Sequence, residues 1–490
     1  MVKRGSITVF LALILSLVTA LVCTGIESVR MAAARTQILN GADIGLYSLF
    51  GQFDREMLKD YDLFLLDGSC GEGSLDLASV YDNFSSYMKP VLKQNSQKLS
   101  VVQGGFSAYR LLTDEGGEPF YNQVVQYMKE TLGSQGVSLL LDKMKDRKEK
   151  TEQAEQAGQQ AENGDIIENY DAEMEENNRK NEEALAEAEK NPEGGELEDE
   201  DNVTAPPQKV VNPISIIRRI RKMGILELVI PGNKGVYDGQ VQAGSLLSRR
   251  EKQKGMPMYE PEKTDTSYTS QILFQQYLME KLGNYTAPGK GTLKYQTEYI
   301  LGGKTGDIEN LKSVARRLLL IREGVNMVHL VSDGTKRAQA AGLASAIASA
   351  FLIPPATGVI EAALLLCWAF GESILDVREL FDGGKVPLVK SASDWQLSLE
   401  NLPELLNGLD SVRRGSEDGM SYEDYLQVLL LGVSREEKIT RAMDMIELCV
   451  REKGRKNFRM DSCIVAAEIS VDVKANKRKV FNVTRAYGYY

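Results

Sequence analysis

The stretch that decides the architecture is MVKRGSITVFLALILSLVTALVCTGIESVRMAAARTQILNGADIGLYSLFGQF, residues 1–53. The twenty residues from Ile7 to Ile26 carry no charge, and their polar side chains are small. A bilayer core of roughly 30 Å needs about 20 helical residues at ~1.5 Å rise each. A soluble helix of ordinary design does not stay apolar on every face over that length. Residues 7–26 therefore predict a membrane-spanning helix that contacts lipid.

The charges ahead of this segment predict its orientation. Lys3 and Arg4 make residues 1–6 a basic leader that belongs in the cytoplasm, so the bulk of the chain is expected outside it. A cleaved secretory signal is one alternative, although the apolar run exceeds the ~7–15 residues of a signal core. A lipoprotein signal ending at Cys23 is another, although Val22 is large for the position before the cysteine. All three alternatives put the rest of the chain across the membrane.

The helix is expected to continue beyond the membrane as an amphipathic stalk. Apolar side chains recur at steps of three or four residues, which places them on one helical face. This packing face consists of Ile38, Ala42, Leu46, Leu49 and Phe53. We expect residues 27–144 to form the stalk helix and the first part of an extracytoplasmic α+β domain.

The composition changes sharply in residues 145–207. Between Asp165 and Asp201 there are sixteen acidic residues and three basic ones, and aliphatic side chains almost vanish. Such a segment buries too little apolar area to offset the entropy of ordering it. We therefore predict an acidic, Glu-rich disordered linker, with transient helix at most over residues 182–190.

Residues 208–490 are expected to hold the second part of the α+β domain. An apolar helical hairpin is predicted over residues 338–377, buried in the domain, with membrane insertion as the alternative. Strict apolar–polar alternation over residues 463–489 predicts a C-terminal β-hairpin. The hairpin needs further strands, and a short strand over residues 61–67 is the candidate partner. The fold class is therefore α+β, mostly helical, with a small antiparallel sheet.

Few residues are available for chemistry. His329 is the only histidine, and it lies in an apolar run, which favours a buried structural histidine over a catalytic one. The five cysteines have no C-x-x-C spacing, so neither a zinc site nor a disulfide framework is indicated; Cys449 and Cys463 are the one pair considered for a bridge. The net charge of −11 gives no indication of a basic surface that would bind nucleic acid. We predict no catalytic, cofactor or metal site, and hence no enzyme.

The N-terminal stretch resembles a known group of proteins. Lys3 to Ser6 followed by the apolar run resembles a type IV prepilin leader, which implies possible processing between Gly5 and Ser6, although Phe10 stands where prepilins usually carry a glutamate. The membrane-exit motif Gly25, Glu27 and Arg30, and the segment after it, are similar to TadE/TadG-like minor pseudopilins of Tad (Flp-type) pilus systems. The whole chain also looks like an uncharacterised family of Tad-associated bacterial membrane proteins.

This resemblance implies a membrane-anchored cell-envelope protein, a pseudopilin-like component of a Tad-type pilus or secretion assembly. Its partners would be membrane lipid, through residues 7–26, and pilin or pilus-platform proteins. A second hypothesis is an extracytoplasmic binding or sensing module with a plain signal anchor. The third, a hydrolase using His329, has the least support from the sequence.

Overall fold

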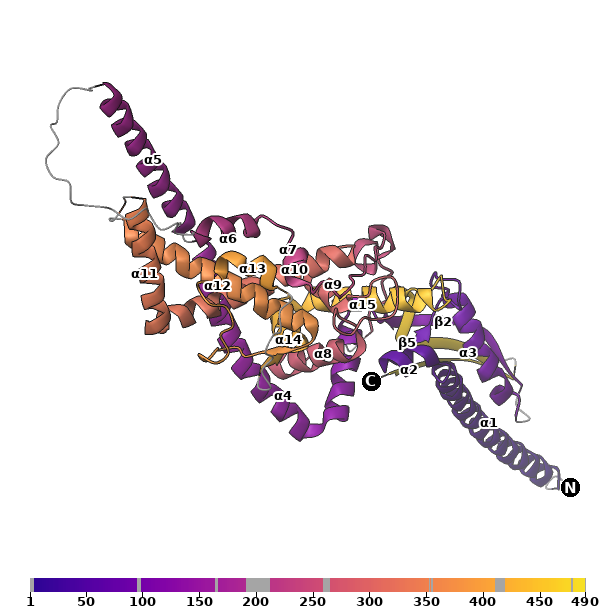
Figure 1. Cartoon of the computed structure of the whole chain (residues 1–490). Helices are drawn as coiled ribbons and strands as arrows, with labels where there is room; N and C mark the ends of the chain where they lie inside the picture. The colour runs from indigo at the N-terminus through magenta and orange to yellow at the C-terminus, as the bar shows by residue number, and fades with distance from the viewer. Residues whose placement is uncertain are drawn as a thin grey trace. The chain divides into compact units, whose positions relative to one another are not determined.

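The computed structural model describes residues 4–94, 98–163, 166–190, 212–258, 265–351, 353, 356–409, 419–476 and 479–489. The chain forms two compact units. Unit 1 comprises Met1–Gly133, Ala243–Tyr277 and Ala442–Tyr490, and unit 2 comprises Ser134–Gln242 and Leu278–Arg441. Three of the four boundaries fall within helices, α4 (Glu118–Asn163), α8 (Tyr268–Lys281) and α15 (Arg435–Glu452), and the fourth lies between Gln242 and Ala243. Figure 1 traces the chain through all its elements.

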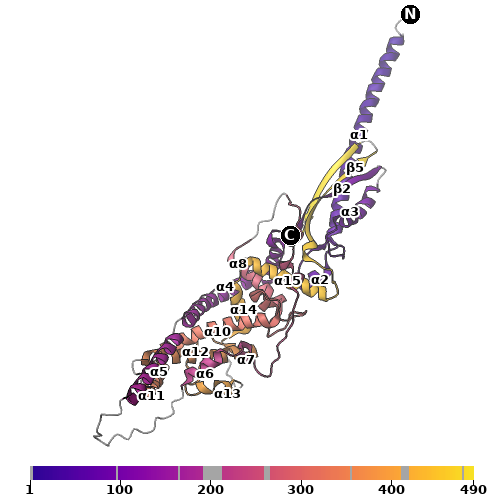
Figure 2. The same ribbon diagram turned by 90° about the horizontal axis from the view of Figure 1, so that it is seen from above.

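Unit 1 is an antiparallel sheet with helices against it. Besides its parts of α4, α8 and α15, its elements are α1 (Arg4–Phe50), α2 (Arg55–Tyr61), β1 (Leu66–Asp67), α3 (Leu77–Leu92), β2 (Leu99–Leu111), β5 (Cys463–Ala475) and β6 (Lys479–Gly488). The central strand β5 pairs with β2 on one side and with β6 and β1 on the other. In Figure 2 α1 and α3 lie beside these strands.

The alternation that predicted the C-terminal hairpin explains the core of unit 1. Ile469, Val471 and Val473 of β5 point inward and are at most 1% exposed. They meet the buried side of α1 and the apolar face of α3, including Phe84 and Met88. The mostly helical α+β class and the C-terminal hairpin are confirmed, with the hairpin formed by β5 and β6.

The predicted strand over residues 61–67 is largely wrong. Residues up to Tyr61 form helix α2, capped by Asp54 through the backbone N–H groups of Glu56 and Met57. Only Leu66 and Asp67 are extended, and they do pair with β5 at Ile464 and Cys463. The helix forms here because its N-cap satisfies the free backbone donors of the first turn.

Unit 2 is built around the helix α12 (Thr357–Asp382), which packs against α10 (Asp307–Ser332) and α11 (Gly334–Ala350). Its other elements are α5 (Ile166–Lys190), α6 (Pro213–Arg221), α7 (Ile225–Val229), α9 (Gln296–Gly302), α13 (Leu405–Gly408), α14 (Tyr422–Leu431) and the short strand pair β3 (Lys385–Val386) and β4 (Met420–Ser421). Helices α11 and α12 occupy the region of the expected apolar hairpin.

The disordered linker expected over residues 145–207 is wrong for its larger part. Helix α4 runs to Asn163 and α5 covers Ile166–Lys190, while residues 191–207 lie outside the described residues. Composition misled here because Glu, Ala, Gln and Lys are also strong helix formers. Tertiary contacts add to this: the ring of Tyr170 is buried, and its hydroxyl accepts a hydrogen bond from Asn212 at 2.6 Å.

Candidate functional site

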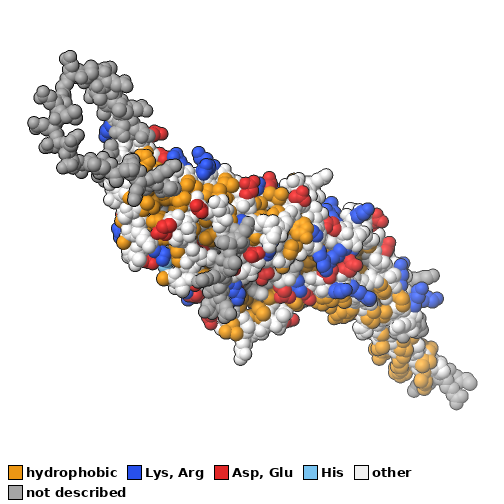
Figure 3. Space-filling view, in the orientation of Figure 1, with side chains coloured by type: hydrophobic (Ala, Val, Ile, Leu, Met, Phe, Trp, Pro, Cys, Tyr) orange, Lys and Arg blue, Asp and Glu red, His pale blue; other side chains and the backbone are white. Residues whose placement is uncertain are grey.

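The N-terminal half of α1 is an exposed apolar rod. Large apolar side chains from Ile7 to Val29 stay in the open; Leu17 and Leu21, for example, are each 70% exposed. Figure 3 shows these hydrophobic side chains along the end of the molecule that carries the N-terminus. Of the described helices, α1 and α12 are long and apolar enough to cross a membrane, but most of the apolar window of α12 is buried in unit 2. Helix α1 is therefore the candidate membrane span or signal anchor.

The residues predicted to process the leader and to mark the membrane exit all lie on α1. Gly5 and Ser6 fall in its first turns. Gly25 has open space where a side chain would be, Glu27 is half-buried and Arg30 is exposed. The first fully buried side chain of α1 is Ala34, one turn beyond Arg30. The exit motif therefore lies between the exposed rod and the packed half of the helix.

Four of the five residues of the predicted packing face lie on α1, and the fifth lies beyond its end. Four of its residues, Ile38, Ala42, Leu46 and Leu49, are at most 2% exposed and belong to the core of unit 1. Phe53 does not share their helix, because α1 ends at Phe50; its half-buried ring instead makes an edge contact with Phe64, with ring centroids 5.4 Å apart.

Two glycines let α3 approach α1 closely. A Cβ on Gly45 would lie 2.8 Å from the ring of Phe84, and one on Gly41 would lie 3.3 Å from Leu92. The side-chain amide of Gln37 donates hydrogen bonds to the carbonyls of Val91 (2.9 Å) and Leu92 (3.3 Å) at the end of α3. Close helix packing and hydrogen bonds therefore both hold the packed half of α1 against α3 in unit 1.

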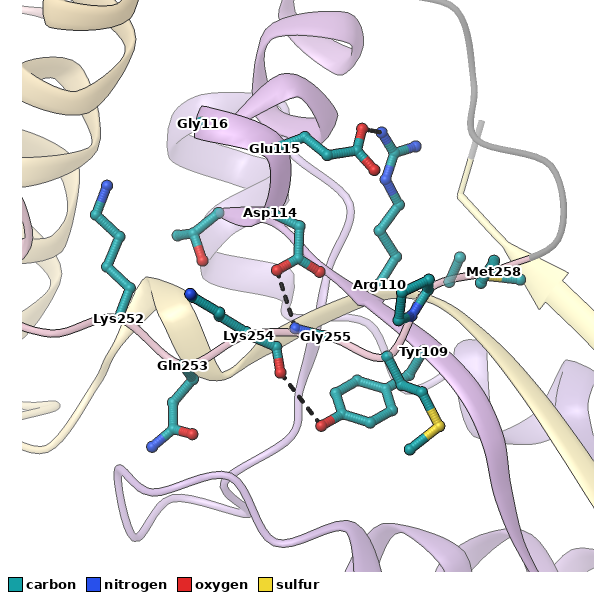
Figure 4. Close-up of a pocket in the computed structure, with 14 residues that line it drawn as sticks. Tyr109, Arg110, Asp114, Glu115, Gly116, Lys252, Gln253, Lys254, Gly255 and Met258 are labelled. Carbon is teal, nitrogen blue, oxygen red and sulfur yellow. Dashed lines mark hydrogen bonds and ion pairs between the residues drawn. The ribbon is translucent and has the colours of Figure 1, made fainter.

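Unit 1 also holds a pocket of about 490 Å³ beside the outer edge of β2. The segment around Met256 forms a two-way backbone bridge with Tyr109, with N–O distances of 2.9 and 3.1 Å. Figure 4 shows that Asp114 accepts a hydrogen bond from the Gly255 N–H and that Tyr109 donates one to the Lys254 carbonyl. Residues from two distant parts of the chain therefore form the two walls.

The chemistry of this pocket suits binding. Arg110 pairs with Glu115 at 2.7 Å on one wall, and Lys252 and Lys254 line the other. Burial raises the pKa of Asp114, whose carboxylate is occupied by the backbone N–H groups of Leu111 and Gly255. The Thr113 hydroxyl, 5% exposed as a residue, has no partner among the described residues. Lys252 and Lys254 are therefore the lining side chains that an acidic ligand could contact.

Sequence reasoning missed this pocket. The available signal was the turn Thr113–Gly117, where Glu115, Gly116 and Gly117 all adopt positive φ. Such a turn after a strand predicts a loop, but nothing in the sequence indicates that residues 252–258 bridge to it.

Unit 2 contains a cluster of buried charges. Asp376, 1% exposed, lies 3.0 Å from Arg322 and 2.6 Å from Lys390, and Lys390 also contacts Glu372. Burial raises the pKa of Glu372, whereas Lys390 and Arg322 hold the pKa of Asp376 below its usual range against the effect of burial. Because these groups satisfy one another inside the core, we assign them a structural role.

His329 lies at the rim of this cluster. Its half-buried ring stacks on Trp395 with centroids 5.2 Å apart, and its Nε2 lies 3.9 Å from Asp333. Burial, together with Lys336, lowers its pKa. Within the described residues, no group of three or more His, Cys, Asp or Glu side chains could hold a metal ion, and all five cysteines are free. The bridge considered between Cys449 and Cys463 is therefore absent.

Comparison with known proteins assigns the chain to a family. The family described as "Family of unknown function (DUF5702)" matches residues 203–475, which is more than half of the chain. No curated protein and no solved structure matches the chain.

Proposed function

Because the chain belongs to the family of unknown function DUF5702, whose description names no activity, we propose its function from its architecture. We propose that it is a non-enzymatic, membrane-anchored cell-envelope protein, a pseudopilin-like component of a Tad-type pilus or secretion assembly. The single observation that carries the proposal is the division of α1 into an exposed apolar half and a half packed into unit 1.

An exposed apolar rod of this length is unfavourable in water. Each exposed leucine or valine side chain would gain roughly 1.5–3 kcal/mol on leaving water. The uncharged part of the rod spans Ile7 to Ile26, and its 20 residues at ~1.5 Å rise cover about 30 Å, enough for a bilayer core. Lipid, or the apolar helices of neighbouring subunits, would remove this apolar surface from water.

The basic start of the chain supports the orientation. Lys3 and Arg4 precede the rod, and the positive-inside tendency keeps such charges in the cytoplasm. Both folded units would then lie outside the cytoplasm. The assembly role rests on the resemblance of the leader and the exit motif to pseudopilins, and on the continuity of the anchor helix with the core of a folded unit.

Co-purification tests the assembly role. The full chain, tagged at its C-terminus, would be solubilised from its host and its companions identified by mass spectrometry. We expect pilin or pilus-platform proteins, and we expect Glu27→Gln with Arg30→Gln to reduce their recovery. Glu56→Gln with Arg55→Gln, at exposed positions of α2, is the matched control. Repeated recovery of the intact chain without such partners would contradict the assembly role.

Replacing Gly5 separates the pseudopilin from a plain signal anchor. If a prepilin peptidase processes the leader, Gly5→Leu should leave a slower-migrating precursor and reduce assembly. Unchanged mobility and unchanged recovery of partners would favour the plain anchor instead.

The pocket beside β2 favours a second candidate function, an extracytoplasmic binding module. This role predicts that filling the pocket, for example by Gly255→Leu, abolishes ligand binding without loss of partners. A Cβ at Gly255 would lie 2.2 Å from the Asp114 carboxylate, so the variant also needs a check of its fold by circular dichroism.

A further inference from the structure

One end of unit 1 faces the apolar half of α1, and three segments meet there. Helix α3 runs antiparallel to α1, since Phe84 lies at Gly45 while Leu92 lies at Gly41 and Gln37. The C-terminal end of α3 is therefore the end nearest the rod.

The turn between β5 and β6 lies at the same end. Tyr489 donates a hydrogen bond to the Phe50 carbonyl, and Arg485 pairs with Asp43 at 2.8 Å, so β6 runs parallel to α1 and its start lies toward the rod. The six residues from Arg485 back to Lys479, at about 3.3 Å each, extend the strand roughly 20 Å toward the rod. Figure 2 shows the strands running beside α1 in this direction.

The start of β2 joins the other two segments. The backbone N–H of Asn476, at the end of β5, donates to the Lys98 carbonyl at 3.0 Å, and Leu99 pairs with Ala475. The ends of α3, β2 and the hairpin thus form one edge around α1.

This edge is basic. We define the basic collar as the six described lysines and arginines that it carries, five of them exposed and one half-buried, without an ion-pair partner among the described residues: Arg35, Lys89, Lys93, Lys98, Lys474 and Lys479. Figure 3 shows Lys and Arg side chains where the folded part meets the apolar rod. At the opposite end of unit 1, just after α1, acids and bases are mixed and paired: Arg455 pairs with Asp54 and Asp67, and Lys453 pairs with Asp60.

The spacing along α1 suits a lipid interface. From Val29, the last large exposed apolar residue before the packed half, to Gln37 is eight residues, or about 12 Å. The headgroup layer on each side of the core is roughly 5–8 Å thick, and long basic side chains reach toward it while their stems stay on the protein. The long basic side chains of the collar can therefore reach from the end of α3 toward the layer where phosphate groups would be if the rod spans the bilayer.

We propose that the basic collar binds the anionic headgroups of phospholipids and holds unit 1 against the membrane surface. This inference rests on the proposed anchoring of the rod in the membrane. The recognised chemistry is the phosphate of an acidic phospholipid such as phosphatidylglycerol. A lysine near an anionic surface favours such lipids by several-fold, and salt weakens the attraction.

Lipid selectivity tests the proposal. The full chain would be reconstituted in phosphatidylcholine vesicles that contain spin-labelled phosphatidylglycerol or spin-labelled phosphatidylcholine as the probe. The motionally restricted part of the spectrum gives the relative association of each lipid with the protein. We expect the native chain to prefer phosphatidylglycerol by about fivefold at low salt. Replacing Lys89, Lys93, Lys98 and Lys479 by glutamine should bring that preference close to unity.

The matched control replaces four exposed basic residues of unit 1 outside the collar, Arg55, Lys59, Arg249 and Lys456, by glutamine, and should keep the preference. Equal association of both lipids with the native chain, or no difference between the two variants, would overturn the proposal and leave the collar to an acidic protein partner. If neither labelled lipid is restricted and the chain fails to float with vesicles at high salt, the anchoring itself fails. If the protein restricts the motion of both labelled lipids equally, the rod still contacts lipid and only the collar proposal fails.

Discussion

At the scale of single residues, unit 2 buries a carboxylic acid without an ionic partner. Glu298 is fully buried, and one of its oxygens accepts hydrogen bonds from the Tyr422 hydroxyl (2.7 Å) and the Tyr285 N–H (2.8 Å). Its other oxygen has no partner among the described residues. Burial raises the pKa of Glu298 to about 7, although both hydrogen bonds act in the opposite direction.

This pKa predicts how the stability of unit 2 depends on pH. The fold keeps a proton that the unfolded chain loses near its ordinary pKa of 4.5, so stability should fall as pH rises from about 4.5 to about 7. The loss would be roughly 3 kcal/mol in the free energy of unfolding. Glu298→Gln should remove that part of the slope. Denaturation of the full chain in detergent, followed through the fluorescence of Trp368 and Trp395, would measure it, and parallel pH profiles for the two proteins would contradict the assignment.

The buried ion cluster gives a second residue-scale prediction. Lys390→Met leaves Glu372 and Asp376 without their shared ammonium group, and breaking such a buried pair costs about 3–5 kcal/mol. The exposed Lys385 nearby is the control, and its change to methionine should alter stability by less than about 0.5 kcal/mol. The same tryptophan fluorescence reports both variants. A loss below about 1 kcal/mol for Lys390→Met would show that the cluster relaxes or takes up protons instead.

At the scale of elements, the packing of α1 on α3 is the contact that ties the anchor to unit 1. Gly45→Leu would drive a side chain into Phe84, and overpacking of this kind costs about 1–3 kcal/mol. Hydrogen exchange of α3 in the full chain should become faster. Gly25→Leu on the same helix meets no atom within 4 Å and serves as the control. Equal exchange in the two variants would mean that α3 does not depend on this contact.

Elements with a strong local pattern were predictable from the sequence. The uninterrupted apolar run predicted the exposed half of α1, and the alternation of apolar and polar residues predicted β5 and β6. Strand β2 was missed because register shifts after Val101 and Phe106 break its alternation, and because Gly104 and Gly105 read as a turn. Helix α5 was mistaken for a disordered segment because few of its side chains are apolar, and its contacts with α12 are visible only in the fold.

The pocket beside β2 was beyond prediction for a different reason. It depends on a bridge between Tyr109 and Met256, which are 147 residues apart in the sequence. A single backbone bridge leaves no periodic signal at either residue. The basic collar likewise draws on three separate segments. Only the packing of α3 (antiparallel) and β6 (parallel) on α1 brings them to one edge.

At the scale of the whole molecule, the account depends on one helix in two environments. The apolar half of α1 would be in lipid, the basic collar at the surface of the membrane, and both folded units outside the cytoplasm. The proposed function rests on anchoring by α1 and on partner contacts, and the description of the family names no activity.

The native cysteines allow the most direct test of this topology. Cys70 is exposed in unit 1, Cys23 lies in the apolar rod, and the other three cysteines are buried. A membrane-impermeant maleimide added at mildly alkaline pH to intact, wall-free cells should label the full chain, and Cys70→Ser should abolish the labelling. Labelling of Cys70 only after the cells are lysed would place unit 1 inside the cytoplasm and contradict the account.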